Sequence, residues 1–69
     1  MNQEVLRQKL TKLRDMGFKM SVIAERLNIS NTTIHAFLKG TKNLYPDATA
    51  NLIKVLYDIQ KDINDIVNR

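Results

Sequence analysis

The twenty residues from Met20 to Lys39, MSVIAERLNISNTTIHAFLK, constrain the fold more than any other part of the chain. Their spacing predicts one helix over residues 20–27 and a second running to about residue 38, joined by a three-residue turn around Asn28. Asparagine is the residue after glycine that most readily takes the left-handed conformation such a turn needs. Ser30 is placed to cap the second helix. The apolar positions that would bury one face are Ile23, Leu27, Ile29, Ile34 and Phe37, with Ala24 where two helix backbones approach closely.

The rest of the chain predicts a small all-α domain of four to five helices spanning residues 1–69. Only two glycines and one proline interrupt it, and no segment alternates apolar and polar residues as a strand would. Asn2 is placed to cap a helix from about Gln3 to Met16, and Gly17 to end it. Its inner face is predicted to consist of Leu6, Leu10 and Leu13, with Phe18 filling the core between the first two helices.

The C-terminal segment, residues 47–68, carries a heptad-like apolar pattern. We expect Asp47 to cap its helix. Two arrangements fit: one long helix that pairs with a second copy, or a bend near residues 57–58 that folds the end back onto the domain. We favour self-association, because the other helices supply a limited core. The predicted dimer interface consists of residues at spacings of four, three, four and three: Leu52, Leu56, Ile59, Ile63 and Ile66.

Charge is distributed unevenly along the 69 residues. Residues 1–43 carry eight Lys or Arg and three Asp or Glu, a net charge of +5, whereas residues 44–69 have a net charge of −1. A basic N-terminal part is typical of proteins that face a polyanion. The chain has no cysteine and one histidine, so we expect no disulfide, metal or cofactor. The lack of an apolar span or signal-like segment predicts a cytoplasmic protein with no membrane partner.

The span from about Leu10 to Leu56 resembles the phage repressor and Cro-type helix-turn-helix family, also called Xre-like or lambda-repressor-like. The resemblance rests on the pair Ile23-Ala24, the turn 28–30, Ile34, Phe37, Gly40, Pro46 and the helix around residues 52–56. It implies four or five short helices, dimeric operator binding and transcriptional control. The chain departs from the family at Met20, where a glutamine usually clasps a phosphate, at Asn28 in place of glycine, and at Leu38 in place of glutamate.

The exposed face of the helix after the turn would read DNA bases in the major groove. Asn31 and Thr32 would enter first, since asparagine pairs with adenine through two hydrogen bonds and the threonine methyl packs on thymine. Ala36 would make a similar apolar contact, and His35 would donate to guanine or to a phosphate. The face carries no arginine, which is the usual reader of guanine, so we expect an A·T-rich site.

A second set of side chains would bind phosphates and so position the domain. The predicted phosphate contacts are Lys19, Ser21, Lys39, Thr41, Lys42 and Asn43. Arg14 would reach a flanking phosphate. For Tyr45 two readings stay open, a phosphate contact through its hydroxyl or half-buried packing. Other basic side chains, those of Arg7, Lys9, Lys12 and Arg26, are expected to be solvated.

Together these features predict a homodimeric transcriptional repressor that binds an inverted-repeat operator in double-stranded DNA. Each copy would place one recognition helix in a major groove, about 34 Å from the helix of its partner. The alternative is an antirepressor or inhibitor that uses the same fold to bind a protein, and a protein antagonist is a further expected partner. An enzyme is not expected, because the chain lacks a cysteine, a paired acid and base in the motif, and a glycine-rich phosphate loop.

Overall fold

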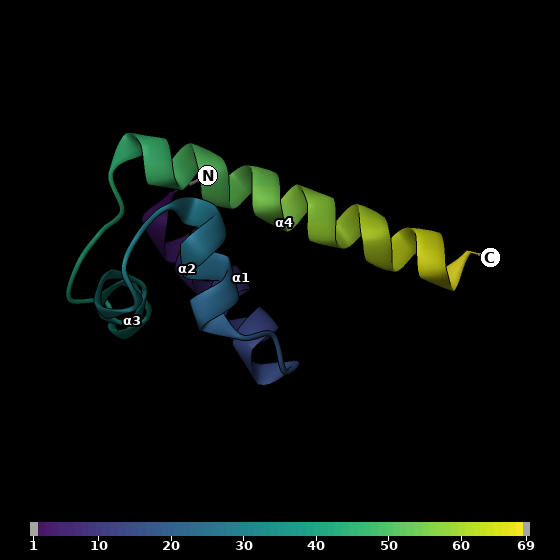
Figure 1. The fold of residues 1–69 in the computed structure, drawn as a ribbon, viewed down its shortest axis with the longest axis horizontal. Helices are drawn as coiled ribbons and strands as arrows, with labels where there is room; N and C mark the ends of the chain where they lie inside the picture. Colours follow the sequence, from purple (N-terminus) through teal and green to yellow (C-terminus); the bar gives the residue numbers. More distant parts are fainter. Residues whose placement is uncertain (1, 69) are drawn as a thin grey trace.

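The computed structural model describes residues 2–68, and within that range the chain forms four helices and no strand (Figure 1). Their bounds are α1 Gln3–Asp15, α2 Met20–Leu27, α3 Asn31–Lys39 and α4 Pro46–Val67. The predicted all-α class is therefore confirmed. In the described part of the chain, none of the helices combines the length and the apolar character needed to cross a membrane.

The first three helices end in the same way. Each is followed, directly or after one further residue, by a residue with positive φ: 104° at Gly17, 57° at Asn28 and 83° at Gly40. The N–H of that residue returns to a carbonyl three residues back, and the next N–H returns to one five residues back. This double hydrogen bond satisfies carbonyls that a helix end otherwise leaves open. The prediction of a left-handed turn residue at Asn28 is confirmed.

The helix starts differ in how they are capped. The Asn2 side chain accepts a hydrogen bond from the Val5 N–H at 2.8 Å, and Ser30 Oγ accepts from the Thr33 N–H at 3.1 Å, both as predicted. The expected cap at Asp47 is wrong, because α4 starts earlier, with Tyr45 as the capping position and Pro46 as its first residue. Proline is favoured there, since its fixed φ suits a helix and its missing N–H would have no partner.

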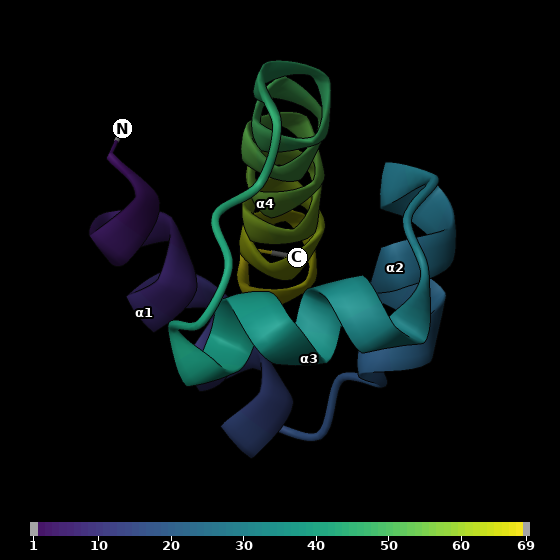
Figure 2. The same cartoon turned by 90° about the vertical axis from the view of Figure 1, so that its left-hand side faces the viewer.

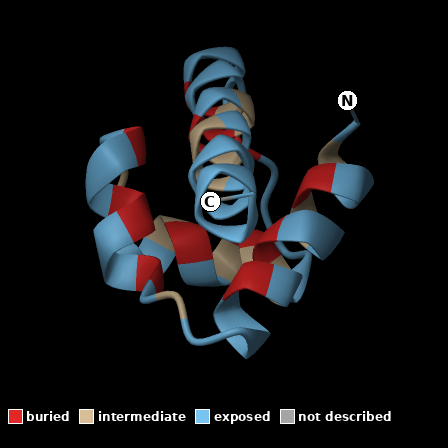
Figure 3. Ribbon diagram, turned by 90° about the vertical axis from the view of Figure 1, so that its right-hand side faces the viewer, coloured by how far each residue is buried: buried red, intermediate tan, exposed pale blue. Residues whose placement is uncertain are grey.

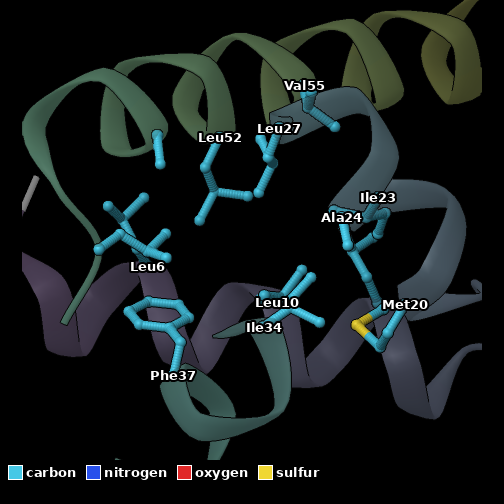
Figure 4. Close-up of a cluster of buried hydrophobic side chains, with 13 residues drawn as sticks. Leu6, Leu10, Met20, Ile23, Ala24, Leu27, Ile34, Phe37, Leu52 and Val55 are labelled. Carbon is cyan, nitrogen blue, oxygen red and sulfur yellow. The ribbon is translucent and has the colours of Figure 1, made fainter. Parts of the chain in front are cut away.

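One apolar core joins all four helices. α3 and α4 each pack against both α1 and α2, and their inner side chains meet in a single cluster (Figure 4). The largest fully buried side chains are Leu6, Leu10, Leu27, Ile34, Phe37 and Leu52. Met20, where the family that the sequence resembles usually has glutamine, is only 6% exposed and belongs to this core. Phe18 packs against it from the α1–α2 turn, as predicted.

α4 is a single helix of 22 residues, so the arrangement in which the chain bends near residues 57–58 is not formed. The other three helices, α1 to α3, form the body of the molecule, and the first half of α4 packs on it. The second half of α4 extends past the body to the far end of a molecule about 40 Å long (Figure 1). Every described residue from position 60 onward is exposed, and this end is pale blue all round in Figure 3. Leu52, predicted as an interface residue, is instead completely buried in the core of its own chain.

Candidate nucleic-acid interface

α3 lies across one end of the molecule, opposite the free end of α4 (Figures 1 and 2). Ile34 and Phe37 fasten its inner face, since both side chains are completely buried. Leu38 is partly buried against the same core. A helix held on one face only leaves the opposite face open, and the sequence decides which groups that face presents.

Three of the four predicted base-contacting residues lie on this outer face. Asn31, Thr32 and His35 are exposed, and within the described chain none of their side chains forms a hydrogen bond or an ion pair with another residue. Ala36 is partly buried, at the edge of the face. The structure therefore brings the predicted reading residues together on one helix, with their polar groups unoccupied by protein.

The start of α2 supplies the first group of predicted phosphate contacts. Lys19 and Ser21 are both exposed, and no side chain caps this helix. The first backbone N–H groups of a helix have no partner inside it and carry a partial positive charge. An uncapped start beside a lysine and a serine hydroxyl is therefore electrostatically suited to a phosphate.

The loop after α3 supplies the second group, and in Figure 2 this loop and α2 lie at opposite ends of α3. Lys39 and Lys42 are exposed, and Lys42 Nζ lies 5.9 Å from the centroid of the Tyr45 ring. Tyr45 is 74% exposed, so half-buried packing is wrong for this side chain. Thr41 donates both its N–H, at 3.0 Å, and its hydroxyl, at 3.1 Å, to the Ala36 carbonyl. Both Thr41 donors are therefore engaged within the protein.

Gln3 of α1 holds the C-terminal part of this loop. Its Oε1 accepts a hydrogen bond from the Leu44 N–H at 3.0 Å, and its Nε2 donates to Thr49 Oγ1 at 3.1 Å. Leu44 itself is 6% exposed and packs into the core. The amide of one α1 side chain thus ties the loop to the first turn of α4.

Arg7, one turn further along α1, holds the other part of the loop. Its Nε donates to the Phe37 carbonyl, its Nη2 donates to Asn43 Oδ1 at 3.1 Å, and its Nη1 pairs with Glu4 at 2.7 Å. The guanidinium also lies 4.8 Å from the centroid of the Phe37 ring. The Arg7 side chain is only 15% exposed, so the expectation that it is solvated is wrong.

The physical reason is the position of Arg7 beside the C-terminus of α3, where unpaired carbonyls and the helix dipole attract a cation. A hint was present in the sequence, since Arg7 directly follows the buried Leu6 and an arginine stem can cover apolar surface. The hydrogen bond to Asn43 also occupies the side-chain oxygen of that residue, which leaves its NH₂ group for a phosphate.

The remaining basic side chains of the body divide into two kinds. Lys9 and Lys12 are exposed, as is Arg14, whose Nε pairs with the neighbouring Asp15 at 3.6 Å. Arg26 was also expected to be solvated, but it pairs with Asp58 of α4 at 3.6 Å, with about half of each side chain exposed. Ion pairs with this exposure contribute little to stability, so the pair mainly orients two side chains on the surface between α2 and α4.

Comparisons with protein-family models, with curated proteins and with solved structures find no match to this chain. An interface at this end of the molecule is therefore supported by the geometry and charge of its residues. Within residues 2–68, no group of three or more His, Cys, Asp or Glu side chains is placed to hold a metal ion. The feature that stands out is the outer face of α3, with cationic and N–H donors beside it.

Proposed function

We propose that this protein is a sequence-specific DNA-binding transcriptional regulator, in which α2 and α3 form a helix-turn-helix of the lambda-repressor-like kind. The observation that carries the proposal is the outer face of α3. Asn31, Thr32 and His35 lie exposed there, with no side-chain hydrogen bond or ion pair to residues 2–68, on a helix fastened from behind by Ile34 and Phe37. Such a helix has the dimensions and the side chains to enter a major groove.

The reading residues differ in what each can recognise. The Asn31 amide both donates and accepts, which matches adenine N7 and N6, while the Thr32 methyl contacts a thymine methyl. His35 donates to guanine or to a phosphate one turn further along the helix. Ala36 is confined to an apolar contact at the edge of the face, because it is partly buried. With no arginine among them, the preferred site is expected to be rich in A·T pairs.

The phosphate contacts would flank the groove on both sides of α3. On the α2 side, Lys19, Ser21 and the uncapped N–H groups replace the glutamine clasp of the related family, whose position is taken by the buried Met20. On the loop side, Lys39, Lys42 and the Asn43 NH₂ group contribute. Contacts of this kind carry no base information, but they set the register in which α3 meets the bases.

The regulator is proposed to act as a homodimer on an inverted repeat, with half-sites a whole number of helical turns apart. Repression would follow from occupying a promoter. A second function, binding a protein as an antirepressor, is supported by one observation, the exposed apolar side chains of Ile66 and Val67 at the free end of α4. Dependence on salt separates the two, because phosphate contacts release counterions and protein contacts on an apolar face do not.

The test is selection of bound sequences from a random DNA pool, followed by affinity measurements over a range of salt concentrations. We expect an A·T-rich, palindromic site whose binding weakens as salt rises. The logarithm of the affinity should fall by about 0.9 for each phosphate contact per tenfold increase in salt. Recovery of no preferred sequence, together with affinity that does not change with salt, would exclude the proposed function.

A further inference from the structure

The apolar seam of α4, the five residues Leu52, Leu56, Ile59, Ile63 and Ile66, has two parts with different surroundings. Leu52 is completely buried by the body of its own protomer, and Leu56 and Ile59 pack partly against that core. Beyond them the exposed fraction rises to 38% at Ile63 and 72% at Ile66, and the neighbouring Val67 is 73% exposed. The seam continues past the point where the body ends, so its last part has no cover within residues 2–68.

We infer that a second copy of this chain covers the distal part of the seam, with the two α4 helices running antiparallel. Self-pairing is supported by the pattern itself, because the a and d positions of a heptad repeat on one helix match those on another. A parallel, in-register partner helix would have to continue along Leu52 and Val55, where α1 and α2 already pack. In the antiparallel pair the two bodies lie at opposite ends of the overlap, each against Leu56 and Ile59 of its own α4.

The antiparallel register follows from which seam residues remain available. Ile59 of each copy faces Ile63 of the other, and Leu56 of each copy faces Ile66 of the other. This register covers all four distal seam positions, and it brings the exposed Val67 beside Ile53 of the other copy, which is partly buried. The overlap spans residues 56–66, about 15 Å of helix at 1.5 Å per residue.

The size of this contact sets the expected strength of the dimer. A single helix pair of about 15 Å buries less than the roughly 1,200 Å² found in stable complexes. The pair therefore belongs to the weak class, and we expect dissociation in the micromolar range. Weak pairing is consistent with the fold, because the main core is already buried within one chain. The second copy buries only the distal end of α4.

One consequence rests on the proposed function. Within each copy, α3 and the free end of α4 lie at opposite ends of the molecule (Figure 1). Antiparallel α4 helices then place the two α3 helices at the outer ends of the dimer. The half-sites of its operator are therefore expected more than one helical turn apart, wider than the one-turn spacing expected from the sequence.

The orientation is tested by disulfide trapping, which the chain suits because it has no native cysteine. Ile59→Cys and Ile63→Cys are made as separate proteins, one with an affinity tag, then mixed and oxidised without DNA. The antiparallel register predicts that the mixed disulfide exceeds either homodisulfide several-fold, because these two positions face each other. Lys61→Cys, on the outer side of the pair, is the control and should crosslink poorly. A dominant Ile63 homodisulfide would show parallel pairing and overturn the inference.

Because Ile59 also packs on the body, a second measurement uses a residue that does not. Sedimentation of Ile66→Asp is compared with Asn64→Asp, an exposed neighbour that receives the same charge away from the seam. We expect the parent and Asn64→Asp to associate at micromolar concentration, and Ile66→Asp to weaken association at least tenfold. A parent chain that stays monomeric at a few hundred micromolar would overturn the second copy as occupant and favour a different protein partner. Neither measurement involves DNA, so failure of this inference is distinguishable from failure of DNA binding.

Discussion

The two ends of this molecule differ in the contacts that hold their helices in place. At the α3 end, an apolar inner face and polar side chains from α1 fix a short helix and the loop after it. At the distal end of α4, a regular helix continues with neither, since its residues from position 60 onward are exposed. Helical periodicity is present at both ends. What differs is whether the apolar stripe meets another part of the same chain.

This difference predicts a difference in local stability. A buried, hydrogen-bonded amide becomes accessible to solvent only when much of the fold unfolds. An amide at an exposed helix end becomes accessible through local unfolding, which costs little free energy. We therefore expect amide hydrogen exchange to be slow around Ile34 and Phe37 and fast beyond Ile63 in dilute protein. Raising the protein concentration should slow exchange at the distal end if a second copy covers it.

The largest predicted effect is a loss of stability when an apolar side chain is removed at the α3 end rather than at the distal end of α4. Phe37→Ala should lower the free energy of unfolding by about 3–5 kcal/mol, because it leaves a cavity beneath α3. A domain of this length has a total stability of about 3–10 kcal/mol, so the variant should be close to unfolding. Ile66→Ala in dilute protein should change stability by less than about 0.5 kcal/mol. Urea unfolding followed by circular dichroism measures both, and equal losses would contradict the contrast.

The next effect concerns Arg7. Arg7→Met keeps the aliphatic stem but removes the hydrogen bonds to Phe37 and Asn43, and should cost about 1–3 kcal/mol of unfolding free energy. Lys9→Met removes the same charge from an exposed site on the same helix and is the matched control. If the two variants unfold at the same urea concentration, Arg7 does not hold the loop.

An effect of similar size is expected on recognition at the α3 end. Asn31→Ala should weaken binding to the preferred operator by about 1–3 kcal/mol and relax the base preference at one position, because the bidentate contact is lost. Titrations against the operator and against single-base variants measure this. Asn51→Ala, an exposed asparagine on α4, serves as the control. Unchanged discrimination in Asn31→Ala would remove this residue from the reading set.

The smallest effect is that of one phosphate contact. Lys42→Ala should weaken binding almost equally for all DNA sequences and reduce the salt slope by about 1. Lys54→Ala, which removes the same charge from α4, should leave the slope unchanged. A salt slope that is the same in both variants would mean that the loop after α3 does not meet the DNA backbone.

Several elements were predictable because their causes are local. The bounds of α2 follow from a few apolar spacings, and the turn at Asn28 follows from the conformation that asparagine tolerates. The predicted caps at Asn2 and Ser30 were correct for the same reason. The start of α4 was missed because Asp47 and Pro46 are both good initiators, and proline at the first helical position prevailed.

Other features depend on contacts between residues far apart in the chain. The role of Arg7 was not predicted, because its partners Phe37 and Asn43 are distant in sequence and meet it only when α1 packs beside the end of α3. The seam of α4 was predicted as one interface, yet Leu52 belongs to the protomer core and Ile66 does not. Periodicity identifies an apolar face but not what covers it.

The helices, the positions of the turns and the side chains that α3 can present could therefore be predicted from the sequence, since each depends on conformational preference and spacing along a short segment. Contacts made in the folded chain set which polar groups are already occupied, as with the two donors of Thr41 and the oxygen of Asn43. Such contacts also set where the body stops covering α4. These outcomes depend on how the helices pack in three dimensions, and a one-dimensional pattern does not specify that packing.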